Sequence, residues 1–155
     1  MTRMPDSKPQ LTIRPAAAAD AAQIKQMIRA ERLDPTSLDW RHFLVAEVPA
    51  EGGSAAIIGI GQVKEYPGCL ELGSLVVLPE YRGQGIAAAL IKALEARGGR
   101  PLYLLCRSEM EGFYQRFGYQ TISFWQAPLV LKLKLLPAPL AAFAGIHARV
   151  MRKRA

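Results

Sequence analysis

The stretch "VVLPEYRGQGIAAALIKAL", residues 76–94, decides the fold of this chain. It begins as an apolar run typical of a buried strand, continues through a proline and two closely spaced glycines, and then changes its periodicity. Ile86, Leu90 and Leu94 recur at helical spacing and form one apolar face. The stretch therefore predicts a strand, a glycine-containing loop and a helix in direct succession.

The loop of this unit has the residues that an anion-binding backbone needs. The first amides of a helix lack intrahelical partners and lie at the positive end of its dipole. Gly83 and Gly85 would let a ligand approach the main chain, and Arg82 adds a charged donor. The loop lacks the Gly-Lys-Ser/Thr of a Walker motif, and Ala88 replaces the third glycine of a dinucleotide fingerprint. A nucleoside triphosphatase and a nicotinamide enzyme are therefore disfavoured.

Length and composition narrow the remaining choices. The chain has 155 residues, half of them hydrophobic and 21% charged, which predicts one globular domain. It has no run of about 18 apolar residues for a membrane span and no apolar signal segment at its start. Cys69 and Cys106 have no metal-ligand or disulfide spacing. We expect a cytoplasmic protein with free thiols and no metal.

The net charge of +7 is concentrated at one end of the chain. Four of the 20 basic residues lie in residues 137–155, which contain no acid, and this leaves 16 basic against 13 acidic residues elsewhere. The body is too weakly basic to predict a nucleic-acid partner. We expect residues 137–155 to form a basic amphipathic helix that packs on the domain or its twin in a homodimer, with membrane contact as the less favoured alternative.

The remaining periodicity predicts three regions: a loose leader over 1–10, a domain over 11–136 and the helix over 137–155. Within the domain, Asp20 is the expected N-cap of a helix over 20–32, and a short turn of helix is possible before residue 43. The other expected helices cover 86–98 and 109–117. The expected strands cover 11–14, 43–48, 56–66, 69–78, 101–107, 119–124 and, as a lysine-bearing edge strand, 129–136.

Two motifs resemble those of the GNAT N-acetyltransferase superfamily. Residues 77–87, "VLPEYRGQGIA", are similar to its acetyl-CoA pyrophosphate loop, and "FYQRFGY", residues 113–119, is similar to its tyrosine motif. The resemblance implies an α/β GNAT fold, with a mixed, mostly antiparallel sheet of about six to seven strands flanked by helices. It also implies acetyl-CoA as co-substrate, with its pantetheine between two splayed parallel strands. The cofactor-binding residues carried over are Leu75, Val76, Val77, Arg82, Gly83, Gln84, Gly85, Ile86, Ala87 and Arg107.

The same resemblance implies direct transfer of the acetyl group to an amine. A strand amide near Val77 would stabilise the oxyanion, and Tyr114 would protonate the departing thiolate. Glu71 is the candidate base, because it lies six residues before Val77 and strand alternation would point both side chains the same way. A solvated strand glutamate and a water chain are the alternatives. We interpret Cys106 as a buried small side chain without a covalent role.

The acceptor is less well defined by the sequence. "CRSEMEGFYQRFGY", residues 106–119, resembles the amino-acid N-acetyltransferases, although Arg107 stands where many GNAT members have an asparagine that contacts the cofactor. This favours a small-molecule amine, such as an amino acid, over a protein N-terminus or lysine. A non-catalytic module that binds acyl-CoA, or is recruited by a partner, is the alternative of another class.

Overall fold

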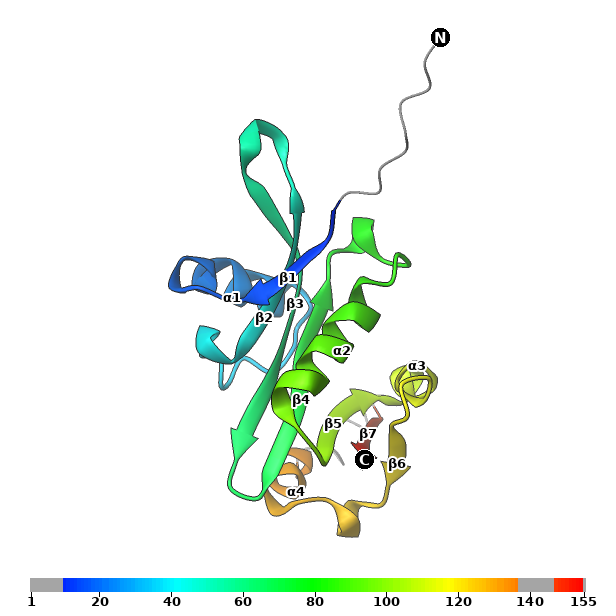
Figure 1. Ribbon diagram of the computed structural model, residues 1–155. Helices are drawn as coiled ribbons and strands as arrows, with labels where there is room; N and C mark the ends of the chain where they lie inside the picture. Colours follow the sequence, from blue (N-terminus) through cyan, green and yellow to red (C-terminus); the bar gives the residue numbers. More distant parts are fainter. Residues whose placement is uncertain (1–9, 137–146, 155) are drawn as a thin grey trace. The chain divides into compact units, whose positions relative to one another are not determined.

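The computed structural model describes residues 10–136 and 147–154, which form one sheet of seven strands and four α-helices (Figure 1). The strands follow the order β1-β2-β3-β4-β5-β7-β6. The strands are β1 Thr12–Pro15, β2 Phe43–Pro49, β3 Ala55–Tyr66, β4 Cys69–Val77, β5 Leu102–Arg107, β6 Gln120–Ile122 and β7 Ala148–Lys153. The helices are α1 Ala21–Ala30, α2 Ile86–Gly98, α3 Glu111–Gln115 and α4 Leu129–Leu135. The predicted fold class is confirmed.

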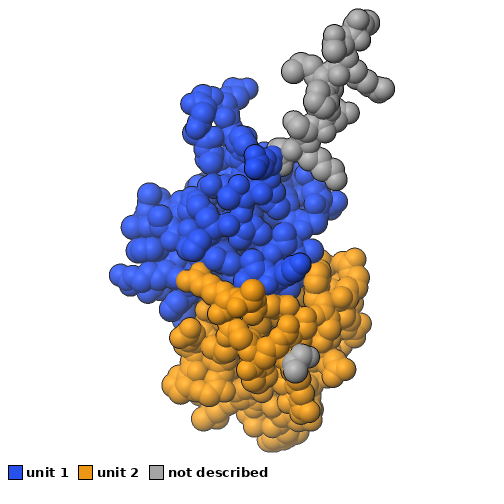
Figure 2. Space-filling view, viewed as in Figure 1, with its two compact units in different colours: residues 1–62, 74–94 blue, residues 63–73, 95–155 orange. Residues whose placement is uncertain are grey.

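The chain divides into two compact units, coloured separately in Figure 2. Unit 1 contains residues 1–62 and 74–94, and unit 2 contains residues 63–73 and 95–155. Strands β3 and β4 and helix α2 contribute residues to both. Within the part of the chain that the structure describes, no helix is long and apolar enough to cross a membrane.

Unit 1 is a layered core with a helix on each face of its strands. Strands β1, β2 and β3 pair in antiparallel fashion. On one face, Ile24 and Ile28 of α1 are buried against residues of β2, β3 and β4. On the other face, Gly59 and Gly61 let α2 approach closely. A Cβ at these glycines would lie 3.0 Å from Leu90 and 2.8 Å from Leu94.

The start of α1 differs from the predicted cap. Asp20 occupies the N-cap position but makes no capping bond to α1. Its buried carboxylate instead accepts a hydrogen bond from the Ala17 amide at 2.7 Å and forms an ion pair with Arg14 at 2.8 Å. The Arg14 guanidinium holds the pKa of the Asp20 carboxyl below its usual range. Asp20 therefore joins β1 to the turn before the helix.

Unit 2 places the last described strand inside its sheet. Strand β4 pairs in parallel with β5 at Glu71 and Tyr103, and β7 pairs antiparallel with both β5 and β6. The prediction of a C-terminal helix is wrong for residues 148–153, because Val150 and Met151 are buried as strand residues. The predicted boundary at 136/137 also falls inside this unit. Residues 137–146 of the expected helix, and 1–9 of the expected leader, lie outside the described residues.

The predicted edge strand over 129–136 is also wrong, because these residues form α4. Leu131 of this helix is fully buried with Cys69, Ala127 and Val150. Leucine and lysine are strong helix formers, and Pro128 precedes the run with its φ of −56°. The alternation of leucine with lysine predicted a strand, but the same residues also form a short helix that buries Leu131.

Candidate active site

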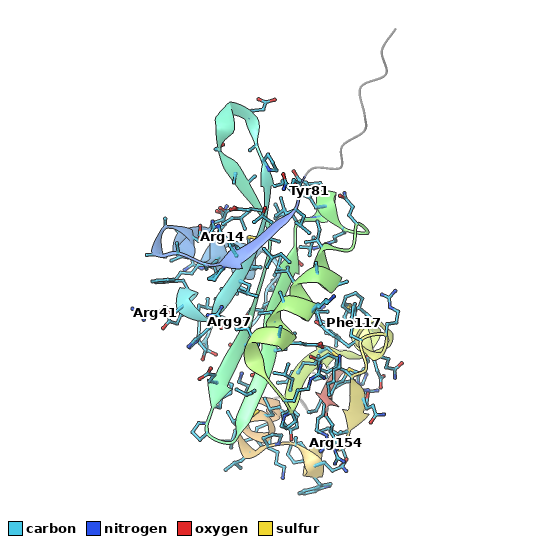
Figure 3. The ribbon with its side chains drawn as sticks, viewed as in Figure 1. Arg14, Arg41, Tyr81, Arg97, Phe117 and Arg154 are labelled. Carbon is cyan, nitrogen blue, oxygen red and sulfur yellow. The ribbon has the colours of Figure 1, made fainter. Side chains whose placement is uncertain are left out.

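The loop between β4 and α2 lies entirely in unit 1 and presents open main chain. A single 3-10 turn, Pro79–Tyr81, follows β4, and Figure 3 labels Tyr81 there. Gly83 and Gly85 then have φ values of 75° and 81°. L-residues rarely adopt this conformation, so the backbone itself requires glycine. A Cβ at either position would meet no atom within 4 Å, which leaves space for a ligand.

The amides at the start of α2 are available to an anion. The amide of Ala89 donates to the Gly85 carbonyl at 3.1 Å, which is the first helical bond. The amides of Ile86 and Ala87 precede it and have no intrahelical acceptor. Gln84 and both glycines beside it are exposed. The predicted arrangement of glycine loop and helix start is confirmed, and its electrostatics favour a phosphate group.

Arg82 is engaged with protein atoms in this structure. Its Nε donates to the Val77 carbonyl at 3.0 Å, and one terminal nitrogen forms an ion pair with Glu31 at 2.9 Å. The side chain is 52% exposed and that of Glu31 38% exposed. The guanidinium thus joins the end of β4 to the end of α1. Because the ion pair is exposed, a bound anion could replace Glu31 at little cost.

Strand β4 contains an irregularity at Ser74, whose φ is 53°. Gln62 Nε2 donates to Ser74 Oγ at 2.9 Å, and a Cβ at Gly73 would lie 3.7 Å from Lys64 Cε. The Gln62–Ser74 hydrogen bond lies within unit 1, and the approach of Lys64 to Gly73 lies within unit 2. The left-handed backbone at Ser74 interrupts the regular geometry of the strand.

Glu71 belongs to unit 2 and Val77 to unit 1, and the shared direction expected of their side chains stays a prediction. Glu71 shares the face of Gly73, because its Oε1 would lie 3.9 Å from a Cβ there. In unit 1, the Cδ1 of Leu75 approaches within 3.2 Å of the position of a Cβ at Gly61. Val77 follows Leu75 by two residues and takes the same face as Leu75.

Glu71 lies in a buried polar cluster of unit 2. Its side chain is 6% exposed and forms an ion pair with Lys134 of α4 at 2.7 Å. Lys134 also donates to the Tyr66 hydroxyl at 2.7 Å. Burial lowers the pKa of Lys134, but the hydrogen bonds to Glu71 and Tyr66 outweigh it and raise the pKa to about 12. Lys134 therefore stays charged and occupies the carboxylate oxygen Oε2, which favours a structural role for Glu71.

Tyr114 is held as a buried phenol on α3 of unit 2. Its ring packs edge-on against Phe113 at 5.1 Å and Tyr119 at 6.1 Å between centroids. Burial, with a smaller contribution from Cys106, raises the pKa of Tyr114 to about 12. The hydroxyl keeps its proton at neutral pH and is suited to donate it.

Cys106 and Arg107 end strand β5. Cys106 is half-buried, and its Sγ lies 3.7 Å from Met151 Sδ. Burial, with a contribution from Glu111, raises the pKa of the Cys106 thiol to about 11, so it is a poor nucleophile. Arg107 is exposed, and its contact with the cofactor stays a prediction. Among the described residues, no group of His, Cys, Asp or Glu side chains could hold a metal ion.

Two side chains of these sites were missed by sequence reasoning. Lys134 was hidden because the run over 129–136 was interpreted as an edge strand. Gln62 belongs to no motif, and its one signal is a polar residue in the apolar strand "AIIGIGQVKEY". A polar side chain at the centre of such a strand needs partners. The sequence does not say which partners these are.

The family comparison agrees with the loop geometry. The model for the acetyltransferase (GNAT) domain matches residues 39–121, which is more than half of the chain. The chain belongs to the GNAT acetyltransferase family. The co-substrate of this family is acetyl-CoA, and the match includes β4, the glycine loop and the tyrosine of α3. No curated protein matches the sequence significantly.

Solved structures show the same fold at low sequence identity. N-acetylglutamate synthase from Neisseria gonorrhoeae, complexed with coenzyme A and L-arginine, has a TM-score of 0.72 at 18% identity over 95% of this chain. This GNAT chain corresponds to only 34% of that enzyme's length. Rv2747 from Mycobacterium tuberculosis, in complex with CoA and NLQ, has a TM-score of 0.71 at 18% identity over 93% of this chain and 99% of its own. NAA60 from Arabidopsis thaliana, in complex with a bisubstrate analogue, has a TM-score of 0.63 at 16% identity, over 94% and 98% of the two chains.

Proposed function

We propose that this protein transfers the acetyl group of acetyl-CoA directly to a primary amine on a small molecule such as an amino acid. The observation that carries the proposal is the glycine loop of unit 1. Gly83 and Gly85 have the left-handed backbone that only glycine adopts easily, and the space in front of them is open. An anion of the size of a diphosphate would receive the amides of the loop and of the helix start.

In this proposal each chain segment has one task. Residues 83–87 bind the diphosphate through their amides, and Leu75–Val77 pair with the amides of the pantetheine. The amine nitrogen attacks the thioester carbonyl, and an amide near Val77 stabilises the oxyanion. When the carbon–sulfur bond breaks, Tyr114 gives its proton to the thiolate of CoA. Its raised pKa supports this task, because the phenol remains protonated at neutral pH.

For the base, we propose a water chain that carries the amine proton to bulk solvent, in place of direct proton transfer to Glu71. The ion pair with Lys134 supports this choice, because it occupies Glu71 Oε2 at 2.7 Å. Glu71→Gln should then change the pH profile of turnover very little once loss of folded protein is corrected for. A profile that loses its acidic limb in Glu71→Gln, with folded protein unchanged, would restore Glu71 as the base.

The acceptor class rests on similarity. Residues 106–119 resemble the amino-acid N-acetyltransferases, and the Neisseria neighbour is named an N-acetylglutamate synthase. A protein N-terminus or lysine is the second acceptor class, and NAA60 and the NatC complex bound to Gag peptide are among the neighbours with this fold.

Two measurements test the proposal. Acetyl-CoA and CoA should each raise the melting temperature of the purified protein, since a ligand that binds only the folded state stabilises it. Thiol release from acetyl-CoA should then be followed with L-glutamate, L-arginine, a polyamine and a short peptide with a free α-amine. Binding without turnover on any amine would favour the non-catalytic acyl-CoA module. Failure to bind CoA would overturn the assignment of the loop.

A further inference from the structure

Gln62 is a buried polar side chain at the centre of β3, with no exposed surface. Its Nε2 donates to the Ser37 carbonyl at 3.1 Å and to Ser74 Oγ at 2.9 Å. The orientation of the amide follows from chemistry, because a backbone carbonyl only accepts hydrogen bonds. The atom that faces Ser37 must therefore be the amide nitrogen. All three residues belong to unit 1.

Both partners of Gln62 have an unusual backbone. Ser37 has a φ of 56° and Ser74 a φ of 53°, and Arg32 is the one other non-glycine residue with positive φ among those described. Residues with a Cβ adopt this conformation at a cost, and surrounding contacts must hold them there. One amide group holds two of the three such residues, which identifies Gln62 as the side chain that maintains this geometry.

The oxygen of the same amide shows that stability alone does not explain the residue. Gln62 Oε1 is buried and has no hydrogen-bond partner among the described residues. A buried acceptor without a donor destabilises the folded state, and natural cores contain few of them. An apolar side chain of similar size would avoid this loss. The glutamine is therefore explained by the hydrogen bonds that its amide nitrogen donates to Ser37 and Ser74.

These hydrogen bonds act on the strand segment that follows Ser74. Ser74 immediately precedes residues 75–77, and Arg82 Nε holds the Val77 carbonyl at the other end of this segment. Arg82 also reaches Glu31, while Gln62 reaches Ser37. Two polar side chains thus connect the ends of segment 74–77 to the chain that follows α1.

We propose that Gln62 is a positioning residue for acetyl transfer. By holding Ser74 in its left-handed conformation, it sets the direction in which residues 75–77 present their amides. The inference rests on the proposed function, in which these amides hold the thioester arm and the oxyanion. The diphosphate loop has its own anchor at Arg82, so loss of Gln62 should affect turnover more than CoA affinity.

The experiment compares Gln62→Leu with Gln23→Leu. Gln23 of α1 also donates through Nε2 to a backbone carbonyl of unit 1, that of Ile57 at 3.4 Å, and serves as a control on an exposed residue. With L-glutamate as the first acceptor, or the fastest amine of the panel, kcat should fall at least tenfold in Gln62→Leu. The dissociation constant for CoA should stay within about threefold of wild type, and Gln23→Leu should change neither value.

A rescue variant separates positioning from general stability. Glycine adopts a φ near 53° without a tether. The double variant Gln62→Leu/Ser74→Gly should therefore regain most of the kcat that the single variant Gln62→Leu loses. Absence of rescue, or a parallel change in kcat and CoA affinity, would overturn the proposal. If Gln62→Leu does not fold, Ser74→Ala removes the same hydrogen bond and should reduce kcat with CoA affinity retained; an unchanged kcat in that variant would equally overturn it.

A second readout does not depend on turnover. Amide hydrogen exchange at residues 75–77 should become faster in Gln62→Leu and remain unchanged in Gln23→Leu. Unchanged exchange in both variants would overturn the inference. If the wild-type protein acetylates no amine, the proposed function fails, yet the exchange measurement still decides whether Gln62 holds this segment.

Discussion

Two ion pairs, one in each unit, show how differently this protein uses a glutamate and a basic residue. Arg82 and Glu31 meet at 2.9 Å beside the glycine loop, with side chains 52% and 38% exposed. Lys134 and Glu71 meet at 2.7 Å inside unit 2, with side chains 21% and 6% exposed. Water already stabilises the first pair when it opens. The second has no such alternative, so the exposed pair can be exchanged for a ligand and the buried pair must stay closed.

The largest effect should come from breaking the buried pair. Lys134→Met leaves the Glu71 carboxylate buried without its cation and should lower the free energy of unfolding by about 3 kcal/mol. The double variant with Glu71→Gln removes the uncompensated charge and should recover part of that loss. Urea denaturation of the single and double variants measures both values. A double variant as unstable as the sum of its single variants would show that the pair is not coupled.

The buried phenol of unit 2 should reveal itself at high pH. A free tyrosine has a pKa of about 10, whereas burial raises the pKa of Tyr114 to about 12. The folded state binds this proton more tightly, so the contribution is complete below pH 10 and is lost as the pH rises from 10 to 12. Tyr114→Phe should flatten this decline by about 2 kcal/mol. Parallel stability curves for the two proteins would contradict a buried, protonated phenol.

The same Tyr114→Phe variant tests the proposed proton donor at neutral pH. Its kcat should fall at least tenfold, while the KM for acetyl-CoA should change little. Phenylalanine keeps the ring contacts with Phe113 and Tyr119, so lost packing would not explain the effect.

The glycine loop provides a comparison in which backbone strain is matched. Gly85 and Gly52 both have positive φ, 81° and 77°, and a Cβ at either would meet no protein atom within 4 Å. Alanine at each position should cost a similar 1–2 kcal/mol, roughly, of stability. Only Gly85→Ala should weaken CoA binding, by about tenfold or more, because its methyl group would enter the space assigned to the diphosphate. Equal CoA affinities in the two variants would contradict the assignment of the diphosphate to this loop.

The smallest effect on stability should come from the exposed pair. Arg82→Ala should lower the free energy of unfolding by about 1 kcal/mol or less. CoA affinity should fall several-fold, and charge reversal in Arg82→Glu should weaken it further through repulsion of the phosphates. Isothermal titration with CoA at two salt concentrations checks this, since the Arg82→Glu deficit should shrink at high salt. A stability loss as large as that of Lys134→Met would mean that the two pairs do not differ as described.

The comparison also explains which parts of the molecule could be predicted from sequence. The glycine loop depends on local requirements: two residues with positive φ, a helix start and a strand before it. Each of these requirements selects particular residue types at its own position, so the strand, loop and helix of residues 76–94 were predicted correctly. Gly118 shows the same local requirement, since the chain after α3 has a φ of 87° at this glycine.

Unit 2 depends on contacts between residues that are distant in sequence, and such contacts produce no clear local sequence pattern. The run over 129–136 is compatible with both a period of two and a short helix, and the helix buries Leu131 with Cys69 and Val150, which are distant in sequence. Val150 and Met151 become strand residues because β5 and β6 flank them. The backbone at Ser74 in unit 1 likewise depends on Gln62 of another strand, a contact that no local pattern indicates.

The place of β7 has a consequence for the order in which the protein can fold during synthesis. This strand is the last of the described elements to be made, yet it lies between β5 and β6, which are made earlier. Until residue 153 has left the ribosome, β5 and β6 each present an unpaired edge to the surroundings. A nascent chain stalled just before β7 should therefore recruit chaperones strongly, and release of the last strand should end that recruitment.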